Sequence, residues 1–126
     1  MSGVDGVAAA ASGLRLTPRG MARVGQLVLG HGPRVVSPDW LAAALRPRVR
    51  VEAGLDYGYQ WYVVTDARPY PWYAAMGNGG QRIFALPDLD VVVAVTAGGY
   101  DAADQSATPL AVLDEVLRAY GSDGLP

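Results

Sequence analysis

Apolar residues recur at helical spacing at three places along the chain, each time after a hydroxyl residue followed by proline. The pairs are Thr17-Pro18, Ser37-Pro38 and Thr108-Pro109. A hydroxyl side chain is a good N-cap and proline suits the first helical position, so each pair indicates a helix start. The apolar positions that follow are Met21, Val24, Leu27 and Val28, then Trp40, Leu41 and Ala44, and finally Leu110, Leu113, Val116 and Leu117. This pattern predicts two helices near the start of the chain and one near its end.

Helix-breaking residues follow each of these segments. The run Gly30-His31-Gly32-Pro33 is expected to end the first helix, Pro47 the second and Gly121 the third. His31 is the single histidine of the chain and lies between two glycines. We interpret it as part of the helix C-terminal cap rather than as a catalytic base.

The middle of the chain has the composition of β-strands. Aromatic and β-branched residues predict strands over 57–64, 72–76, 81–86 and 90–97, after a loop that follows Arg48-Val49-Arg50. Pro87-Asp88-Leu89 indicates a hairpin between the last two strands. Segment 91–95 is apolar on both faces, which predicts a central strand covered on both sides. Asp88 and Asp90 resemble a carboxylate pair, but a hairpin turn favours aspartate in any case.

The order of these elements predicts an α+β fold. We expect a partial antiparallel sheet of three to four strands, packed with two N-terminal helices and one C-terminal helix. The 126 residues are enough for a single domain. We therefore treat 1–126 as a single domain, and the family resemblance given below makes it a partial domain.

Composition narrows the possible functions. Apolar residues make up 51% and charged residues 17%, which is typical of a globular protein. The net charge is −2, so nucleic acid and anionic membranes are not expected as partners. There is no cysteine and a single histidine, so we expect no metal site, and nothing indicates a cofactor. Segment 1–11 lacks the features of a signal peptide and no apolar run could span a membrane, which leaves a cytoplasmic location as the default.

Three segments together resemble one protein family. They are 12–27, reading SGLRLTPRGMARVGQL; 35–40, reading VVSPDW, with 57–61, YGYQW; and 77–93, reading GNGGQRIFALPDLDVVV. In this order and near this spacing they resemble the C-terminal region of the β-lactamase-related serine hydrolases. That superfamily includes class C β-lactamases, esterases and 6-aminohexanoate-oligomer hydrolases and has penicillin-binding-protein-like members. The resemblance covers 12–120. Where the family usually has aspartate at the third position of the first helix, this chain has Gly20, which should weaken the helix start.

The resemblance implies an α+β fold of the β-lactamase/transpeptidase type and hydrolysis of amides or esters through an acyl-enzyme. By the same resemblance, catalysis needs an S-x-x-K motif, a Y-x-N or Y-x-S motif, and a strand motif of the K-T-G or H-x-G type. Serine is a poor nucleophile unless a neighbouring group takes its proton. The chain has no lysine, since all ten basic residues are arginine, so S-x-x-K cannot occur in it. Tyr120-Gly121-Ser122 matches Y-x-S literally but falls at the wrong place in the family order.

The strand motif is present by position. Ala75-Met76-Gly77 falls where the family has H-x-G or K-T-G, and the resemblance makes 75–79, that is Ala75, Met76, Gly77, Asn78 and Gly79, the candidate substrate-binding segment. Gly77 and the N–H of Asn78 are the candidates for the substrate strand and the oxyanion hole. Ala75 offers no charge to a substrate carboxylate, which argues against a penicillin-type substrate. The alternative interpretation is that the glycine run is only a bulge or a tight turn.

We therefore expect a fragment of a serine hydrolase, inactive alone, whose parent takes a small amide or ester. The alternative is a non-catalytic module that self-associates or binds a small ligand, and an independent enzyme with an unrecognised site is a third hypothesis. In the family, strands from the N-terminal region complete the sheet. The edge they would occupy should be bare here, which predicts a homodimer, pairing with a complementing N-terminal half, or poor solubility.

Overall fold

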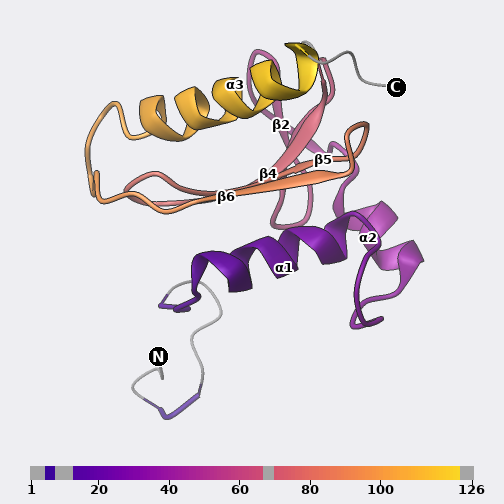
Figure 1. Ribbon diagram of the computed structural model, residues 1–126. Helices are drawn as coiled ribbons and strands as arrows, with labels where there is room; N and C mark the ends of the chain where they lie inside the picture. Colours follow the sequence, from indigo (N-terminus) through magenta and orange to yellow (C-terminus); the bar gives the residue numbers. More distant parts are fainter. Residues whose placement is uncertain (1–4, 8–12, 67–69, 123–126) are drawn as a thin grey trace.

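A single antiparallel sheet with helices on both faces forms the molecule. The computed structural model describes residues 5–7, 13–66 and 70–122, and Figure 1 shows α1 and α3 on opposite faces of the sheet. The helices are α1 (Pro18–Val28), α2 (Pro38–Ala44) and α3 (Ala107–Ser122). The strands are β1 (Val49–Glu52), β2 (Leu55–Tyr57), β3 (Tyr62–Val64), β4 (Trp72–Gly77), β5 (Gln81–Leu86) and β6 (Val91–Val95). They lie in the order β1-β2-β3-β4-β5-β6, and every neighbouring pair is antiparallel.

The α+β class predicted from the sequence is confirmed, but the sheet has six strands instead of three to four. Strand β1 was not expected, and its second half lies where a loop after Arg50 was predicted. The single strand expected over 57–64 is two strands with a turn between them. Gly58 lies so close to α2 that a Cβ atom there would be 2.1 Å from the carbonyl oxygen of Ala44. Gln60 has a φ of 67°, a left-handed conformation that turns the chain back.

Strand β6 was expected in the middle of the sheet, and this was wrong. It pairs with β5 alone, so in the described part of the chain it is an edge strand. Its two faces are nevertheless covered as expected, by α1 on one side and α3 on the other (Figure 1). An apolar run indicates that both faces of the strand are buried. It does not indicate whether the strand pairs with a neighbouring strand on each of its two edges.

The first two helix starts are confirmed atom by atom. The Oγ1 of Thr17 accepts a hydrogen bond from the N–H of Gly20 at 3.0 Å, and the Oγ of Ser37 accepts one from Trp40 at 3.1 Å. Helix α3 differs, because it begins at Ala107 and Pro109 lies in its first turn. Proline is tolerated there because the first-turn N–H groups have no intrahelical partner. The helix also continues past Gly121 to Ser122, so Gly121 does not end it.

The core lies between the sheet and α3. It consists of buried residues from β4, β5 and β6 and one from α3: Ala74, Phe84, Leu86, Val93, Val95 and Leu113. On the other face, α1 approaches the sheet very closely at Gly25. A Cβ atom at Gly25 would lie 2.5 Å from Cγ1 of Val92 and 3.0 Å from Cγ2 of Ile83. This glycine allows the helix to contact β5 and β6 directly.

Helix α2 is held to the rest of the molecule by a turn and an aromatic stack. The N–H of Tyr59 donates to the carbonyl of Ala44 at 2.9 Å. The Tyr59 ring stacks on Trp40, with centroids 5.5 Å apart, and the guanidinium of Arg48 lies 3.9 Å from the Tyr59 centroid. The Trp40 side chain is thus stacked although the residue remains 54% exposed.

Candidate functional site

The predicted substrate-binding segment occupies the end of β4 and the turn that follows it. Strand residues alternate between faces, and residues paired directly across an antiparallel ladder share a face. Met76 pairs with Arg82 and lies on the α3 face with the core. Ala75 pairs with Ile83, which contacts α1, so Ala75 lies on the opposite face. The segment is therefore contiguous, but its side chains do not line one common cleft.

Asn78 in the turn is engaged through its side chain. Its Nδ2 donates to Oδ1 of Asp101 at 2.9 Å, and its Oδ1 accepts the backbone N–H of Asp101, also at 2.9 Å. Asp101 adopts a φ of 59°, in the left-handed region that Asn and Asp tolerate best. This reciprocal pair fastens the β4–β5 turn to the loop that leads into α3.

The glycines of the same turn are covered by that loop. Gly79 and Gly80 are buried and have φ values of 92° and 98°, which favour glycine strongly. A Cβ at Gly79 would lie 2.9 Å from the Tyr100 ring, and one at Gly80 would lie 2.9 Å from the carbonyl oxygen of Gln105. The N–H of Gly79 donates to Oε1 of Gln105 at 2.7 Å. The glycine run thus has a packing role, and a role of Gly77 and Asn78 toward a substrate stays a prediction.

No serine with a described side chain is arranged as a nucleophile. The Oγ of Ser37 caps α2, and the Oγ of Ser106 accepts a hydrogen bond from Nη2 of Arg82 at 2.8 Å. An arginine stays protonated in proteins, so it cannot take the proton of the hydroxyl. Nucleophilic catalysis requires a neighbouring base, and neither of these two serines has one.

Arg82 is the buried charged residue of the described chain, with 5% of its surface exposed. Its Nη1 donates to the carbonyl oxygens of Gly77 at 3.1 Å and Gln81 at 2.9 Å, in addition to the bond from Nη2 to Ser106. Burial lowers the pKa of Arg82 from its usual value, while the nearby Tyr62 acts in the opposite direction. The guanidinium borders a cavity of about 290 Å³ between β1, β2, the central strands and the start of α3.

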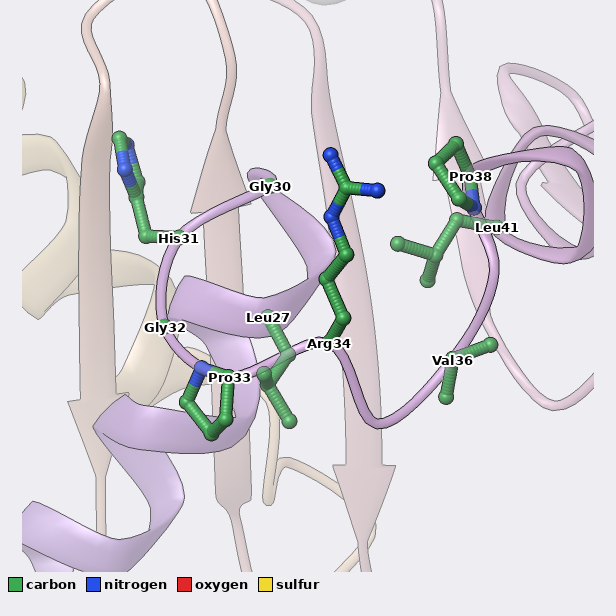
Figure 2. A pocket seen from close by; sticks show the side chains of 9 residues that line it. All are labelled: Leu27, Gly30, His31, Gly32, Pro33, Arg34, Val36, Pro38 and Leu41. Atoms are coloured by element: carbon green, nitrogen blue, oxygen red, sulfur yellow. The ribbon is translucent and has the colours of Figure 1, made fainter.

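A smaller cavity of about 160 Å³ lies at the connection between α1 and α2 (Figure 2). His31 lies at its border, and its backbone N–H donates to the carbonyl of Gln26 at 2.8 Å. With the bond from Gly30 to Leu27, this completes a C-terminal helix cap. The His31 ring lies 2.6 Å from Asp90, Nε2 to Oδ1, and both side chains are exposed. The capping interpretation of His31 is confirmed, and its ring joins α1 to the β5–β6 turn.

The described residues give no sign of a metal centre or of a membrane span. In residues 5–7, 13–66 and 70–122, no group of three or more His, Cys, Asp or Glu side chains could hold a metal ion. None of the helices there has the length and apolar character that crossing a membrane requires.

Sequence reasoning missed Arg82 and Ser106. One signal was present, because Arg82 alternates with Phe84 and Leu86, which places a charge on the buried face of a strand. A charged residue at a buried position is rare unless it is paired with an opposite charge or a polar group, so the alternation indicates a candidate functional residue. The contact with Ser106 had no signal, since 24 residues separate the two and only the packing of α3 brings them together.

Comparison with known proteins adds no assignment. No family model matches the chain, and no curated protein matches it.

Proposed function

We propose that this chain is the C-terminal, substrate-side region of a β-lactamase-related serine hydrolase and that it does not hydrolyse amides or esters alone. The observation that carries the proposal is the contact between two of the resembling segments. Gly25, in the segment 12–27, lies against Ile83 and Val92, in the segment 77–93. Two of the three stretches that together carry the resemblance therefore pack against each other, which supports the proposal.

The expected inactivity rests on the missing proton acceptor. Without lysine, S-x-x-K is absent from the chain. The hydroxyls of Ser37 and Ser106 are engaged with a helix N-terminus and with a guanidinium. The proposed contribution of this region to the parent enzyme is Gly77, which lets substrate approach the strand, and the backbone N–H of Asn78 as an oxyanion donor.

The proposed partner surface is the outer edge of β6, which pairs with no other strand among the described residues. Its five residues, Val91–Val95, are all apolar, and a bare apolar edge strand offers unpaired N–H and C=O groups to another strand. We propose that a second copy of the chain or a complementing N-terminal half pairs there. Sedimentation velocity at high protein concentration tests this, because a clean monomer that forms no complex with such a half contradicts it.

The inactivity is tested with a nitrophenyl ester at neutral pH and with a fluorophosphonate probe, which labels activated serines. We expect neither turnover nor labelling. The variants Ser37→Ala and Ser106→Ala serve as controls. Any ester hydrolysis that is unchanged in both variants does not depend on these serines and counts as background. Turnover or labelling that a serine substitution abolishes contradicts the proposed inactivity.

The family proposal itself is tested by the coding sequence upstream of Met1. An in-frame S-x-x-K followed by Y-x-N supports the proposal, and the longer protein then provides the enzyme to assay. If the reading frame holds neither motif, and no separately encoded N-terminal half restores ester hydrolysis when mixed with this chain, the hydrolase proposal fails.

A second candidate function, binding of a small molecule without catalysis, is favoured by one specific observation. A buried guanidinium borders a cavity whose remaining lining is mostly apolar. Such a combination of an apolar pocket with a few polar groups is typical of small-molecule sites.

A further inference from the structure

Arg82 is a buried cation whose hydrogen-bond partners are all neutral. They are the carbonyl oxygens of Gly77 and Gln81 and the hydroxyl of Ser106. None of the ion pairs formed by the described residues includes Arg82. Buried charges in proteins are normally paired with an opposite charge, because neutral acceptors replace only part of the lost hydration. The site therefore has an excess positive charge.

The direction of the Arg82 pKa agrees with this geometry. Burial lowers that pKa, which means that the surroundings disfavour the charged form. The guanidinium nevertheless stays protonated at any physiological pH. An anion placed next to it would relieve the unfavourable burial of its charge.

The cavity beside Arg82 has room for such an anion and for an apolar group attached to it. Its volume is about 290 Å³, and a dry apolar cavity of about 150 Å³ already holds benzene. Apolar side chains make up most of its wall: Leu55, Val64, Trp72, Met76, Phe84 and Leu110. Arg82 and Ser106 provide the polar part of the wall, and the exposed Glu52 also borders the cavity.

We infer that this cavity binds a small organic monocarboxylate with an apolar body. Its carboxylate would lie on the guanidinium of Arg82 and the hydroxyl of Ser106, and its body against the apolar wall. The Oγ of Ser106 accepts a hydrogen bond from Arg82, which leaves its own proton free to donate to the ligand. Guanidinium and carboxylate match in geometry and form strong charge-assisted hydrogen bonds.

Two features select a single negative charge. Arg82 is the one cationic residue that lines the cavity among the described residues, and Glu52 brings a carboxylate to the same wall. A dianion such as a phosphate monoester would meet one attractive and one repulsive charge. A neutral amide of the same shape would gain no charge-assisted bond.

Arg82 and Ser106 lie outside the proposed substrate segment 75–79, although Met76 also lines the cavity and the carbonyl of Gly77 accepts a hydrogen bond from Arg82. The side chain of Arg82 lies on the α3 face, whereas Ala75 lies on the α1 face. The inferred ligand deepens the second candidate function, small-molecule binding, and does not depend on the hydrolase proposal.

Isothermal titration and amide NMR of the full chain with benzoate, benzamide and phenyl phosphate test the inference. We expect benzoate to bind in the millimolar range or tighter and to shift the amide signals of Gln81 and Ser106. Benzamide and phenyl phosphate should each bind at least tenfold more weakly. Equal binding of benzoate and benzamide, or no binding of benzoate, overturns the inference.

Variants locate the site. Arg82→Met should weaken benzoate binding at least tenfold, and Ser106→Ala severalfold, whereas Arg23→Met, which removes an exposed arginine of α1, should leave it unchanged. Glu52→Gln should tighten the binding of phenyl phosphate severalfold, because it removes the repulsive carboxylate. If Arg82→Met does not fold, Ser106→Ala and Glu52→Gln decide the matter. Benzoate binding that persists in Arg82→Met or is unaltered in Ser106→Ala overturns the inference, and so does phenyl phosphate binding that Glu52→Gln leaves unaltered.

Discussion

Replacing Gly58 by alanine tests the packing of α2 on the sheet more sharply than any other substitution. Gly58 is buried in the turn between β2 and β3. The added Cβ would lie 2.1 Å from the carbonyl oxygen of Ala44 and 3.0 Å from that of Arg46. Both are backbone atoms, one at the last residue of α2 and one just beyond the helix, so no side-chain rotation can relieve the contact. The helix end and the turn must move apart.

The expected loss in the free energy of unfolding follows from the contacts that this movement disrupts. Overpacking of a core typically costs about 1–3 kcal/mol, and a contact with rigid backbone belongs at the upper end. The hydrogen bond from Tyr59 to Ala44, 2.9 Å long, lies at the same place, and its loss adds about 1 kcal/mol. Alanine returns about 0.4–1 kcal/mol by restricting the unfolded chain. We expect a net loss of about 3 kcal/mol in the free energy of unfolding, or a Tm lower by roughly 10 °C for a chain of this size.

Urea unfolding followed by tryptophan fluorescence measures this change, with thermal unfolding by circular dichroism as a second readout. Gly98→Ala is the matched control, because a Cβ at Gly98 would meet nothing within 4 Å. The control should stay within about 0.5 kcal/mol of the unsubstituted protein or be slightly more stable. If Gly58→Ala is as stable as Gly98→Ala, the close contact between α2 and the turn is not present in solution, and the reasoning is refuted.

The remaining predictions concern α1, the core and the helix caps. Gly25→Ala should destabilise the chain by about 1–3 kcal/mol, and Val92→Ala should restore part of that loss in the double variant, because the two side chains compete for the same space. Additive losses in the chemical-unfolding double-mutant cycle would contradict this contact. Leu86→Ala, at a fully buried position, should cost about 2–5 kcal/mol in the same assay, and a loss below 1 kcal/mol would place Leu86 outside the core. Thr17→Ala and Ser37→Ala each remove a hydrogen bond to a helix N-terminus and should each cost about 0.5–2 kcal/mol, whereas unchanged unfolding midpoints would show that the caps contribute nothing.

The helices were the most predictable part of the fold, because their signals are local. Thr17 and Ser37 cap the helices that the sequence predicts, since a cap depends only on residues within one helical turn. The hairpin between β5 and β6 was equally local. The division of 57–64 into two strands was not, because it depends on Gly58 meeting the end of α2.

The candidate site shows the same division. The glycine run at 77–80 was found from its sequence, yet its burial under Tyr100 and Gln105 depends on a loop about 20 residues further on. The reciprocal pair between Asn78 and Asp101 is likewise a tertiary contact. These contacts explain why glycine is required at Gly79 and Gly80, and a sequence motif alone does not contain that information.

Local sequence was sufficient to predict the α+β class, the first two helix starts and the β5–β6 hairpin, and it shows that no lysine is present to activate a serine. Each of these depends on residue identity or on neighbours along the chain. Long-range packing was needed to place β6 at an edge of the sheet in the described part of the chain and to bury Arg82 beside Ser106 and a cavity. The apolar sequence of a strand is the same whether one or both of its edges are paired. Side chains contact the two faces of a sheet, whereas pairing at the edges is made by backbone hydrogen bonds. Arg82 becomes a buried charge only when α3 packs across the sheet and shields the guanidinium from water.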